Sequence, residues 1–508
     1  MMKYLKPSYK GINAKTLTSF IASAYMLMLF VIYPFYMKEG YVNISDHKFT
    51  FFLYSSIGAV LLLLLTGFTE LIKSMNSFRS TDAFMLLFIL VTVVSYLLSD
   101  YKDTAILGTG GWYLGLVFLV LISVLYLLIS RLWEFEVYVL YAALIASFFV
   151  FILGIFDRFS IYLIPLEIRT PSFISTLGNI NWFMGYSSVL MPLGAGLFLS
   201  EINASENRLT LRGGLLGVYT LVAFCAGFAQ GSESVFLVYF VIFNAYLFLL
   251  YKQAISGYSV GILLIIWGIA SQLIRLFRVL YPIGYNYNTD GPCAYMTSHS
   301  VGVYFAVVGL LFCTIKSDNS KAIMKTIAKI IFLIEAVLIA GIIVIGMLKT
   351  KVEMFGGINS SLFYFDERFG SFRGVAYGVS IDILMRFSPL QWIFGIGPDC
   401  FSKIAYSYKD LSARLMNVWP NDTLTNAHSE LLTMLINQGI MGLITYLGIF
   451  ITFLKSSLKR YTNPILWCIS LSVMCYMVHN LISFMQVLST PYIFILMAIA
   501  SVYTVENP

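Results

Sequence analysis

Long apolar stretches alternate with short polar ones along the chain, and this pattern predicts a bundle of membrane-spanning helices. A helix that crosses the hydrocarbon layer needs roughly 20 mostly apolar residues. Fourteen stretches approach that length, and we therefore expect an all-α, polytopic transmembrane bundle of about 12–14 helices. The stretches lie near residues 17–37, 49–69, 83–98, 113–130, 136–156, 181–199, 213–229, 234–251, 257–272, 301–315, 330–348, 429–454, 464–484 and 489–504.

One long polar insertion interrupts this pattern. It divides the chain into a first set of transmembrane helices (residues 1–348), a large loop (349–428) and a second set of helices (429–508). Within the loop, residues 370–390 carry apolar side chains at helical spacing and predict a helix that packs on the bundle. Polar chemistry, if the protein performs any, is expected in this loop.

Composition supports a membrane protein. Of the 508 residues, 59% are hydrophobic and 11% are charged, whereas soluble domains average roughly 25% charged residues. The net charge of +7 comes from scattered loop residues and not from the dense Lys/Arg clusters that bind nucleic acid, so no nucleic-acid partner is expected. The basic N-terminus precedes an apolar run that is too long for a signal-peptide core, and we interpret this run as an uncleaved first helix.

The distribution of positive charge predicts the orientation. With the N-terminus inside, the inner segments carry 17 Lys and Arg residues and the short outer loops carry 7. Because cytoplasmic loops are enriched in Lys and Arg, both termini are expected in the cytoplasm and the large loop outside.

The cysteine and histidine patterns do not indicate a metal site. The six cysteines form no Cys-x-x-Cys pair, and the four histidines include no His-Glu-x-x-His motif. Cys293 and Cys400 both fall in predicted outer loops, which leaves a disulfide between them open.

Two arginines are candidates for binding an anion. Arg368 and Arg373 lie near the N-terminal end of the predicted helix 370–390, where free backbone N–H groups favour negative charge. A guanidinium adds a planar fork that suits phosphate or pyrophosphate. The alternative is that both arginines pair with Asp366, Glu367 or lipid headgroups.

His428 is the candidate general base. It precedes the apolar stretch 429–454 at a water-exposed helix entrance, between Asn426 and Glu430. An imidazole titrates near neutral pH and can accept a proton there. The alternative is an ordinary interfacial histidine.

Other polar and glycine positions have competing explanations. Asn179 and Asn181 at the start of stretch 181–199 fit helix capping or sugar contacts. The turn around Gly395 and Gly397 could present backbone donors to a phosphate, and Gly439 with Gly442 fits close helix packing. Polar residues within apolar runs are expensive in lipid, so we expect these to face the bundle interior: Glu335, His479 and Asn480.

The order of several motifs carries a resemblance. Leu177-Gly178-Asn179-Ile180-Asn181-Trp182-Phe183 enters a mid-chain helix. In and after the large loop come an Arg-x-x-x-Tyr pattern at Arg373, Phe394-Gly395-Ile396-Gly397-Pro398, a His-x-x-x-Leu pattern at His428 and Gly439-x-x-Gly442. This arrangement over residues 165–455 resembles the bacterial O-antigen ligase and O-antigen polymerase family, which includes capsular polysaccharide polymerases.

The resemblance implies a metal-independent, inverting glycosyltransferase of glycosyltransferase-C-like fold in the bacterial cytoplasmic membrane. Its donor would be an undecaprenyl-pyrophosphate-linked oligosaccharide, its acceptor a glycan or lipid-linked glycan, and no cofactor is implied. Chain-length regulators and flippases are the protein partners that such an enzyme would have. By similarity, Arg373 would bind the donor pyrophosphate and His428 would assist the acceptor hydroxyl. Asn179, Asn181, Asn426 and Glu430 would be candidate glycan contacts.

The chain departs from the family pattern at two places. Ser429 follows His428 where the family often has Asn, and Gln230-Gly231-Ser232-Glu233-Ser234 stands where many members have Ser-Arg-Gly. A second pyrophosphate arginine cannot be carried over to that loop. The charge would have to come from Arg169, Arg275 or Arg278, or from Arg368 beside Arg373.

We therefore expect a membrane glycosyltransferase that polymerises or ligates lipid-linked glycan on the outer face of the membrane. A transporter or flippase for the same lipids is the main alternative, but it would distribute charge through its helices, whereas charge here concentrates at the outer rim. A non-catalytic assembly partner of the same fold is a further alternative.

Overall fold

The computed structural model describes residues 14–74, 78–166, 169–206, 208, 210–285, 291–314, 320–351 and 366–506. These residues form an all-α bundle, and its only regular strands within the described ranges are the two-residue β1 (Phe173–Ile174) and β2 (Gly178–Asn179), which pair antiparallel. The long bundle helices are α1 Ala14–Leu27 (continued by η2 Met28–Ile32 and η3 Tyr33–Phe35), α2 Ile44–Ser74, α3 Ser80–Leu98, α5 Leu116–Leu132, α6 Tyr138–Arg158, α7 Ile180–Ala204, α8 Leu211–Ala229, α9 Val235–Tyr251, α10 Gly257–Leu280, α12 Val301–Thr314, α13 Ser320–Lys351, α18 Glu430–Ser457, α19 Pro464–His479 and α20 Thr490–Glu506. The shorter elements are α4 Lys102–Leu107, α11 Pro292–Ser298, α14 Phe369–Leu384, α15 Pro389–Phe394, α16 Phe401–Ser407, α17 Lys409–Val418 and η7 Leu458–Arg460.

Each of the fourteen predicted apolar stretches coincides with a helix of the bundle. Within the described residues, nine helices are long and apolar enough to cross a membrane, and α11 with α12 forms a further candidate span that bends by 82°. Four other apolar helices are shorter than 18 residues. The prediction of a polytopic, all-α membrane protein is therefore confirmed at this level.

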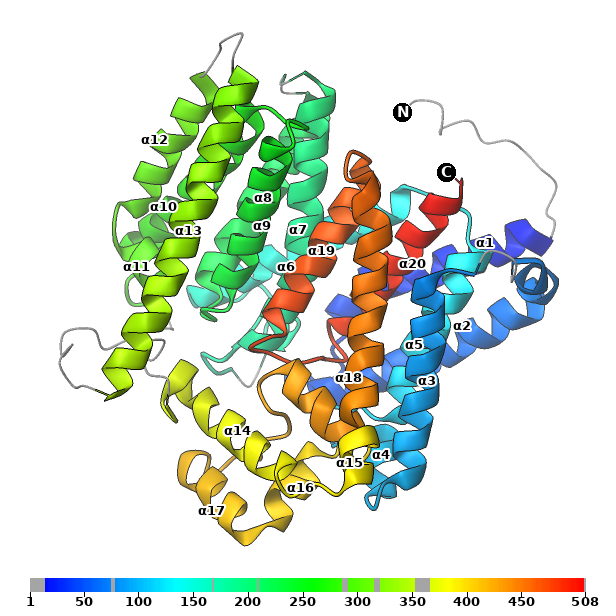
Figure 1. The fold of residues 1–508 in the computed structure, drawn as a ribbon. Helices are drawn as coiled ribbons and strands as arrows, with labels where there is room; N and C mark the ends of the chain where they lie inside the picture. Colours follow the sequence, from blue (N-terminus) through cyan, green and yellow to red (C-terminus); the bar gives the residue numbers. More distant parts are fainter. Residues whose placement is uncertain are drawn as a thin grey trace.

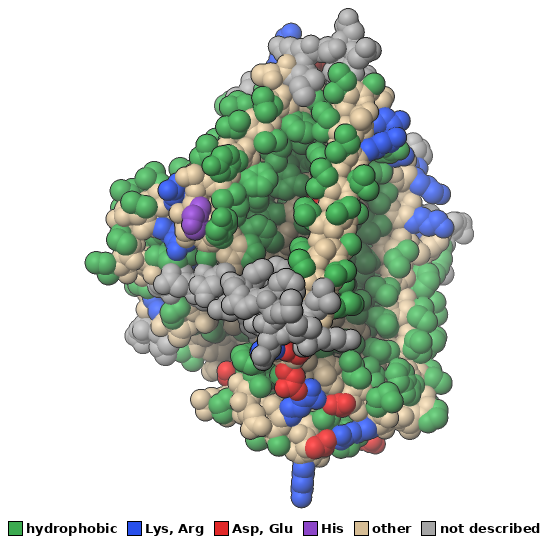
Figure 2. Space-filling model, turned by 60° about the vertical axis from the view of Figure 1, so that its left-hand side comes forward, with side chains coloured by type: hydrophobic (Ala, Val, Ile, Leu, Met, Phe, Trp, Pro, Cys, Tyr) green, Lys and Arg blue, Asp and Glu red, His purple; other side chains and the backbone are tan. Residues whose placement is uncertain are grey.

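The exposed faces of the bundle are strongly apolar. Figure 2 shows one such face, on which hydrophobic side chains predominate; acidic and basic side chains gather together at its lower end, and further Lys and Arg side chains lie along its upper right edge. The outer helix α13 illustrates the pattern, because only 6% of its most apolar 18-residue stretch is buried inside the protein. Side chains that face outward in this way match the apolar tails of a bilayer.

Helices α14–α17 lie together at one end of the bundle, opposite the end at which α20 finishes (Figure 1). We call this group, with its connecting segments, the loop region (residues 366–429). It has an apolar core of its own, which includes Val379, Ile383, Phe401 and Leu415. Arg414 on α17 bridges to Asp382 on α14 and to Glu367, so α14 and α17 are also joined by ion pairs. Helix α14 thereby gains a fixed position beside the bundle.

The predicted helix 370–390 is shorter than expected. Helix α14 ends at Leu384, and a new helix, α15, begins at Pro389. The Ser388 hydroxyl accepts a hydrogen bond from Gln391 N, and proline occupies the first helical position of α15. A proline at this position favours the start of a helix over the continuation of one, which explains the break.

Two glycine turns lock the loop region onto α18. Gly439 interrupts α18 with φ 67° and ψ −169°, a conformation essentially restricted to glycine. The break frees backbone carbonyls, and Ile396 N and Gly397 N donate to the carbonyls of Ile436 and Asn437 at 3.2 and 2.9 Å. The Gly397 donor is therefore used within the protein and is not presented to a phosphate. Gly439 forms a break that its spacing did not predict, but the expected close helix packing is present, because a Cβ there would lie 2.4 Å from the Ile393 backbone of α15.

Asp399 anchors a second connection within this end of the molecule. Its Oδ2 atom accepts hydrogen bonds from Thr109 N at 2.7 Å and Leu114 N at 3.2 Å. Its backbone carbonyl accepts a third from Thr109 Oγ1 at 2.9 Å. The carboxyl is 5% exposed, so these bonds form away from water. Asp399 thus fixes the segment between α4 and α5 against the loop region.

The structure shows the surroundings of Cys293, Cys400 and Glu335, about which the sequence left questions open. Cys293 and Cys400 are both free and buried, so they form no disulfide: Cys293 belongs to the main core, whereas Cys400 belongs to the core of the loop region. Glu335 on α13 accepts a hydrogen bond from the Asn244 amide on α9 at 3.5 Å, so it has a polar partner between neighbouring helices.

Candidate functional site

Arg373 lies on the first turns of α14. Its Nη1 atom donates to the Gly370 carbonyl at 2.8 Å, which holds the side chain along its own helix. The Nε atom is buried and has no hydrogen-bond partner in the described part of the chain. Burial lowers the pKa of this guanidinium. A buried donor without an acceptor costs about 1–3 kcal/mol, and an anion beside Arg373 would remove that cost.

His428 lies directly before α18 in a strained conformation. Its φ of 51° is left-handed, and its backbone N–H donates to Asn426 Oδ1 at 3.0 Å. The imidazole packs edge-on against the Phe484 ring at 5.6 Å, and Trp419 lies on another side at 6.5 Å. A non-glycine residue in this region persists only where its surroundings hold it, and such residues cluster at functional sites.

The loop region brings Arg373 and His428 together. The Tyr377 hydroxyl, one turn after Arg373, donates to the His428 carbonyl at 3.4 Å. Burial and the positive charge of Arg373 lower the pKa of His428 from 6.5 to about 3. At neutral pH the imidazole is therefore uncharged, with a lone pair free to accept a proton. We call the surroundings of Arg373 and His428 the Arg373–His428 site.

The segment between α19 and α20 forms the opposite wall of this site. Glu430 N donates to the Asn480 carbonyl at 2.9 Å, and Glu430 Oε2 accepts from Met485 N at 2.6 Å. These bonds tie the start of α18 to residues 480–485 and place Phe484 against His428. Glu430 is only 3% exposed, and its carboxyl group holds the Met485 backbone; the glycan contact expected for it stays a prediction.

His479 at the end of α19 adds a second imidazole. It is 1% exposed, and neither ring nitrogen has a hydrogen-bond partner among the described residues. The charge of Arg373 acts on this imidazole as it does on His428. Three polar groups therefore converge here: the guanidinium and two imidazoles.

The other candidate arginines have partners on different elements. Arg368 pairs with Asp366, its neighbour two residues earlier, which is the alternative we had kept open for it. Arg169 pairs with Asp157 at 3.2 Å and lies over the Tyr162 ring at 3.8 Å. Each of these two guanidiniums therefore has an acidic partner in the structure, and a role for either in binding a pyrophosphate stays a prediction.

Arg275 and Arg278 bind the segment that carries α11 and the start of α12. Arg275 Nη1 donates to Ser300 Oγ at 2.6 Å, and Arg278 Nη1 donates to Thr297 Oγ1 at 2.7 Å. Arg278 also lies over the Tyr285 ring at 4.6 Å. Among the residues that the structure describes, neither guanidinium has an acidic partner within ion-pair distance.

The asparagine candidates serve the backbone. The Asn179 side chain caps α7 by accepting a hydrogen bond from Asn181 N at 2.8 Å, so the capping explanation holds. The Asn181 carbonyl accepts from Gln486 Nε2 at 3.2 Å, which joins α7 to the α19–α20 segment. Asn426 orders the His428 backbone, as described above. The three asparagines thus support the walls of the site.

Sequence reasoning missed the aromatic support of His428. Trp112 packs against Phe484 at 5.0 Å and against Trp182 at 5.8 Å. Trp112 lies in the segment that Asp399 anchors, so a chain of contacts runs from Asp399 through Trp112 and Phe484 to His428. No local motif marks these residues, because they come from four separate segments.

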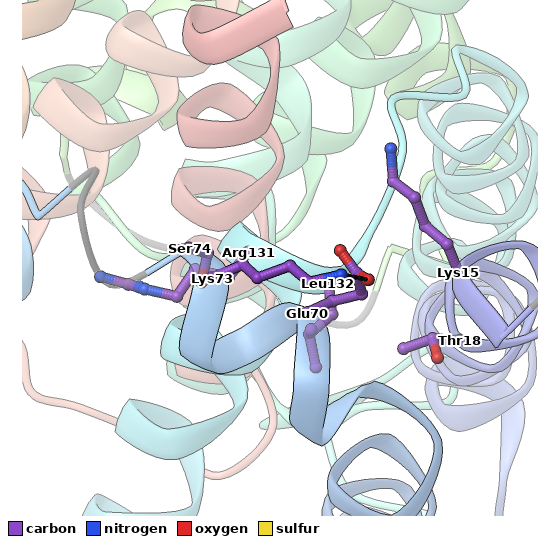
Figure 3. Close-up of a pocket in the computed structure, with 7 residues that line it drawn as sticks. All are labelled: Lys15, Thr18, Glu70, Lys73, Ser74, Arg131 and Leu132. Carbon is purple, nitrogen blue, oxygen red and sulfur yellow. Dashed lines mark hydrogen bonds and ion pairs between the residues drawn. The ribbon is translucent and has the colours of Figure 1, made fainter.

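A pocket of about 210 Å³ lies among α1, α2 and α5, lined by Lys15, Thr18, Glu70, Lys73, Ser74, Arg131 and Leu132 (Figure 3). Each of its cations has an acidic partner. Lys15 pairs with Glu134, Lys73 with Glu70, and Arg131 with Asp82. This balance makes the pocket a weaker anion site than the surroundings of Arg373.

Within the described ranges, no group of three or more His, Cys, Asp or Glu side chains is placed to hold a metal ion. A scan of protein-family models finds none that matches this chain, and a search of curated proteins finds no match. The functional argument therefore depends on the geometry of the Arg373–His428 site.

Proposed function

We propose that this protein is a membrane glycosyltransferase that polymerises or ligates undecaprenyl-pyrophosphate-linked glycan of the O-antigen or capsular type. The observation that carries the proposal is the placement of Arg373 beside the uncharged His428 at the loop-region end of an apolar bundle. An acceptor for the vacant Arg373 Nε donor and a proton donor for His428 are what a diphosphate and a sugar hydroxyl supply.

The reaction needs few parts. The acceptor hydroxyl oxygen attacks the anomeric carbon of the donor sugar, and the bond from that carbon to the diphosphate oxygen breaks. The bonding electrons leave with the polyprenyl diphosphate, and the hydroxyl proton passes to His428. Attack from the face opposite the leaving group inverts the anomeric carbon. Arg373 stabilises the negative charge that develops on the diphosphate, which is the contribution a preorganised cation makes in a site shielded from water.

Binding of the donor would raise the basicity of His428. An imidazole with a pKa of about 3 is a weak base. A diphosphate bound to Arg373 would cancel one of the two causes of that low pKa, the positive charge, while burial would remain. The basicity of His428 therefore rises when the donor is in place, and proton transfer becomes coupled to donor binding.

Features of the architecture support a route for the lipid and a proposed orientation in the membrane. The apolar outer faces of the helices suit a polyprenyl tail that approaches from the bilayer (Figure 2). Cations assigned to the cytoplasm meet partners at the end remote from the loop region: Arg79 bonds the Ser501 carbonyl and Arg460 bonds the Thr504 carbonyl. The positive-inside rule then places the loop region on the outer face of the cytoplasmic membrane, with both termini inside.

The decisive experiment is transfer by the purified protein. Undecaprenyl-pyrophosphate oligosaccharide is incubated with the full chain, and products are resolved by size. A ladder identifies a polymerase, and one unit added to a second acceptor identifies a ligase. No product would overturn the enzymatic proposal and favour a transporter of the same lipids.

Variants locate the chemistry. Arg373→Ala and His428→Ala should each abolish transfer while membrane expression stays normal. Arg386→Ala is the matched control, because Arg386 also lies in the loop region but pairs with Asp410 away from His428, and it should retain transfer. Full activity of both site variants would refute the assignment.

A further inference from the structure

His479 is a buried histidine whose hydrogen-bonding groups are unused. A neutral imidazole has one N–H donor and one lone-pair acceptor, and at 1% exposure neither meets water. Both ring nitrogens also have no partner among the residues that the structure describes. Buried polar groups in folded proteins are almost always paired, so an unpaired one calls for an explanation.

The position of His479 supplies that explanation. The next residue, Asn480, accepts a backbone hydrogen bond from Glu430 N at 2.9 Å, and Glu430 follows His428 by two positions. The Tyr377 hydroxyl, one turn after Arg373 on α14, donates to the His428 carbonyl at 3.4 Å. The vacant nitrogens of His479 and the vacant Nε of Arg373 therefore lie on α19 and α14, two helices that are both connected to the start of α18.

We infer that His479 is a ligand-binding residue of the Arg373–His428 site, and that its imidazole N–H donates to the phosphate oxygens that Arg373 also binds. This inference rests on the proposed function for the identity of the ligand, a prenyl diphosphate. One anion with several oxygen acceptors satisfies both the guanidinium Nε and the imidazole donor. The remaining imidazole nitrogen is left as an acceptor for a sugar hydroxyl.

A structural role makes a different prediction. A histidine that held α19 in place would do so through hydrogen bonds to the protein, and its replacement by an apolar residue of similar size would lower stability without ligand. A ligand-binding histidine is an unsatisfied polar group in the ligand-free protein. Its replacement by Phe should leave ligand-free stability unchanged or higher, because an uncompensated polar group is removed.

Ser470 provides a matched control on the same helix. Its hydroxyl is 0% exposed and also has no partner in the described part of the chain, but it lies nine residues before His479. Ser470→Ala removes a buried polar group of the same kind at a distance from Arg373. It should therefore match His479→Phe in ligand-free stability and the wild type in ligand affinity.

The test measures two quantities on the full chain in detergent. Farnesyl diphosphate is the probe, and its dissociation constant is determined by calorimetry for the wild type, His479→Phe, His479→Gln, Ser470→Ala and Arg373→Ala. The melting temperature of each protein is recorded without ligand. A hydrogen bond to a charged group corresponds to a loss of about ten-fold or more in affinity, which we expect for His479→Phe and Arg373→Ala. His479→Gln, which keeps an N–H donor, should recover part of the affinity.

Defined results overturn the inference. A dissociation constant for His479→Phe within two-fold of the wild type would do so, as would a wild type that binds no farnesyl diphosphate. Should His479→Phe not fold, His479→Leu, which also lacks an N–H donor, is judged by the same two-fold criterion. Farnesyl monophosphate and inorganic pyrophosphate are run in parallel, and equal binding of pyrophosphate alone assigns the site to the phosphates without the lipid. The transfer assay tests the proposed function independently. Diphosphate binding that depends on His479, without any glycan product, would refute the glycosyltransferase activity but still support the diphosphate-binding site.

Discussion

Asp399 offers a direct physical test of how the loop region is held. Burial raises the pKa of its carboxyl from 3.8 to about 7, although hydrogen bonds from Thr109 N and Leu114 N favour the charged form. The folded protein therefore binds this proton more tightly than the unfolded chain does. Stability contributed by Asp399 is present at acidic pH and is lost as the pH rises from about 4 to about 7.

The magnitude follows from these two pKa values. Between pH 5 and pH 7 the unfolded carboxyl stays ionised while the folded one loses its proton. At 1.36 kcal/mol per pKa unit, ionisation of Asp399 lowers the free energy of unfolding by about 2 kcal/mol over this interval. Asp399→Asn removes the ionisation but keeps an oxygen that accepts both N–H bonds. Asp399→Ala removes the acceptor, which costs about 1–3 kcal/mol for each buried N–H group at every pH.

The assay is thermal unfolding of the purified chain in detergent at pH 5, 6 and 7, followed by intrinsic tryptophan fluorescence. All other titrating groups are shared, so the difference between the wild type and Asp399→Asn isolates this carboxyl. We expect Asp399→Asn to gain on the wild type as the pH rises, and Asp399→Ala to fall below both. Parallel pH dependences of the wild type and Asp399→Asn would refute the reasoning. The consequence should reach the site, because Asp399 holds the segment of Trp112, and Trp112 supports Phe484 beside His428.

Three further outcomes are expected. His428→Gln should make the folded protein less sensitive to acid. The pKa of His428 is lowered to about 3, so the stability that His428 contributes is full above pH 6.5 and decreases by about 2 kcal/mol between pH 7 and pH 5. Equal loss of melting temperature in acid for the variant and the wild type would contradict this. Gly439→Ala should lower the melting temperature strongly, because its Cβ would lie 2.4 Å from the Ile393 carbonyl. Gly58→Ala, which has open space around it, should change the melting temperature little. Equal melting temperatures of the two variants would count against the break in α18. EDTA should leave glycan transfer unchanged, because Arg373 supplies the charge; loss with EDTA and recovery with a divalent ion would show otherwise.

The bundle could be predicted because its determinants are local. Fourteen apolar stretches of suitable length became fourteen helices, since a segment in lipid must satisfy its backbone hydrogen bonds internally. The break at Gly439 could not be predicted in this way. It depends on Ile396 and Gly397, about forty residues earlier, which donate to the carbonyls that the break exposes. The prediction of one helix over 370–390 was also wrong, although the Ser388-Pro389 pair is a local signal for the start of α15.

Some residues of the site could also be predicted from the sequence, and others could not. Arg373 and His428 were identifiable because each opens or precedes a helix at the rim of the bundle, but the expected exposure of His428 to water was wrong, because the structure largely buries its imidazole. The partners of Arg169 and Arg368 could not be predicted: Asp157 lies twelve residues before Arg169, and Arg368, two residues after Asp366, looks the same in sequence whether it pairs with that residue or binds a ligand. Asp157 and Asp366 decide the matter through side-chain geometry, which spacing does not specify.

His479 shows most clearly that a sequence does not predict the surroundings of a buried polar side chain. Read along the chain, it is a polar residue at the end of an apolar run, and the expectation that it faces the bundle interior follows from the cost of placing it in lipid. That expectation says nothing about what the imidazole meets inside. The structure joins α19 to α18 through Glu430 N and the Asn480 carbonyl, and α14 to the residue before α18 through Tyr377 and the His428 carbonyl. A second imidazole beside one guanidinium gives the site more donors than a single arginine provides, so a diphosphate can be held there although the Ser-Arg-Gly arginine is absent from residues 230–234.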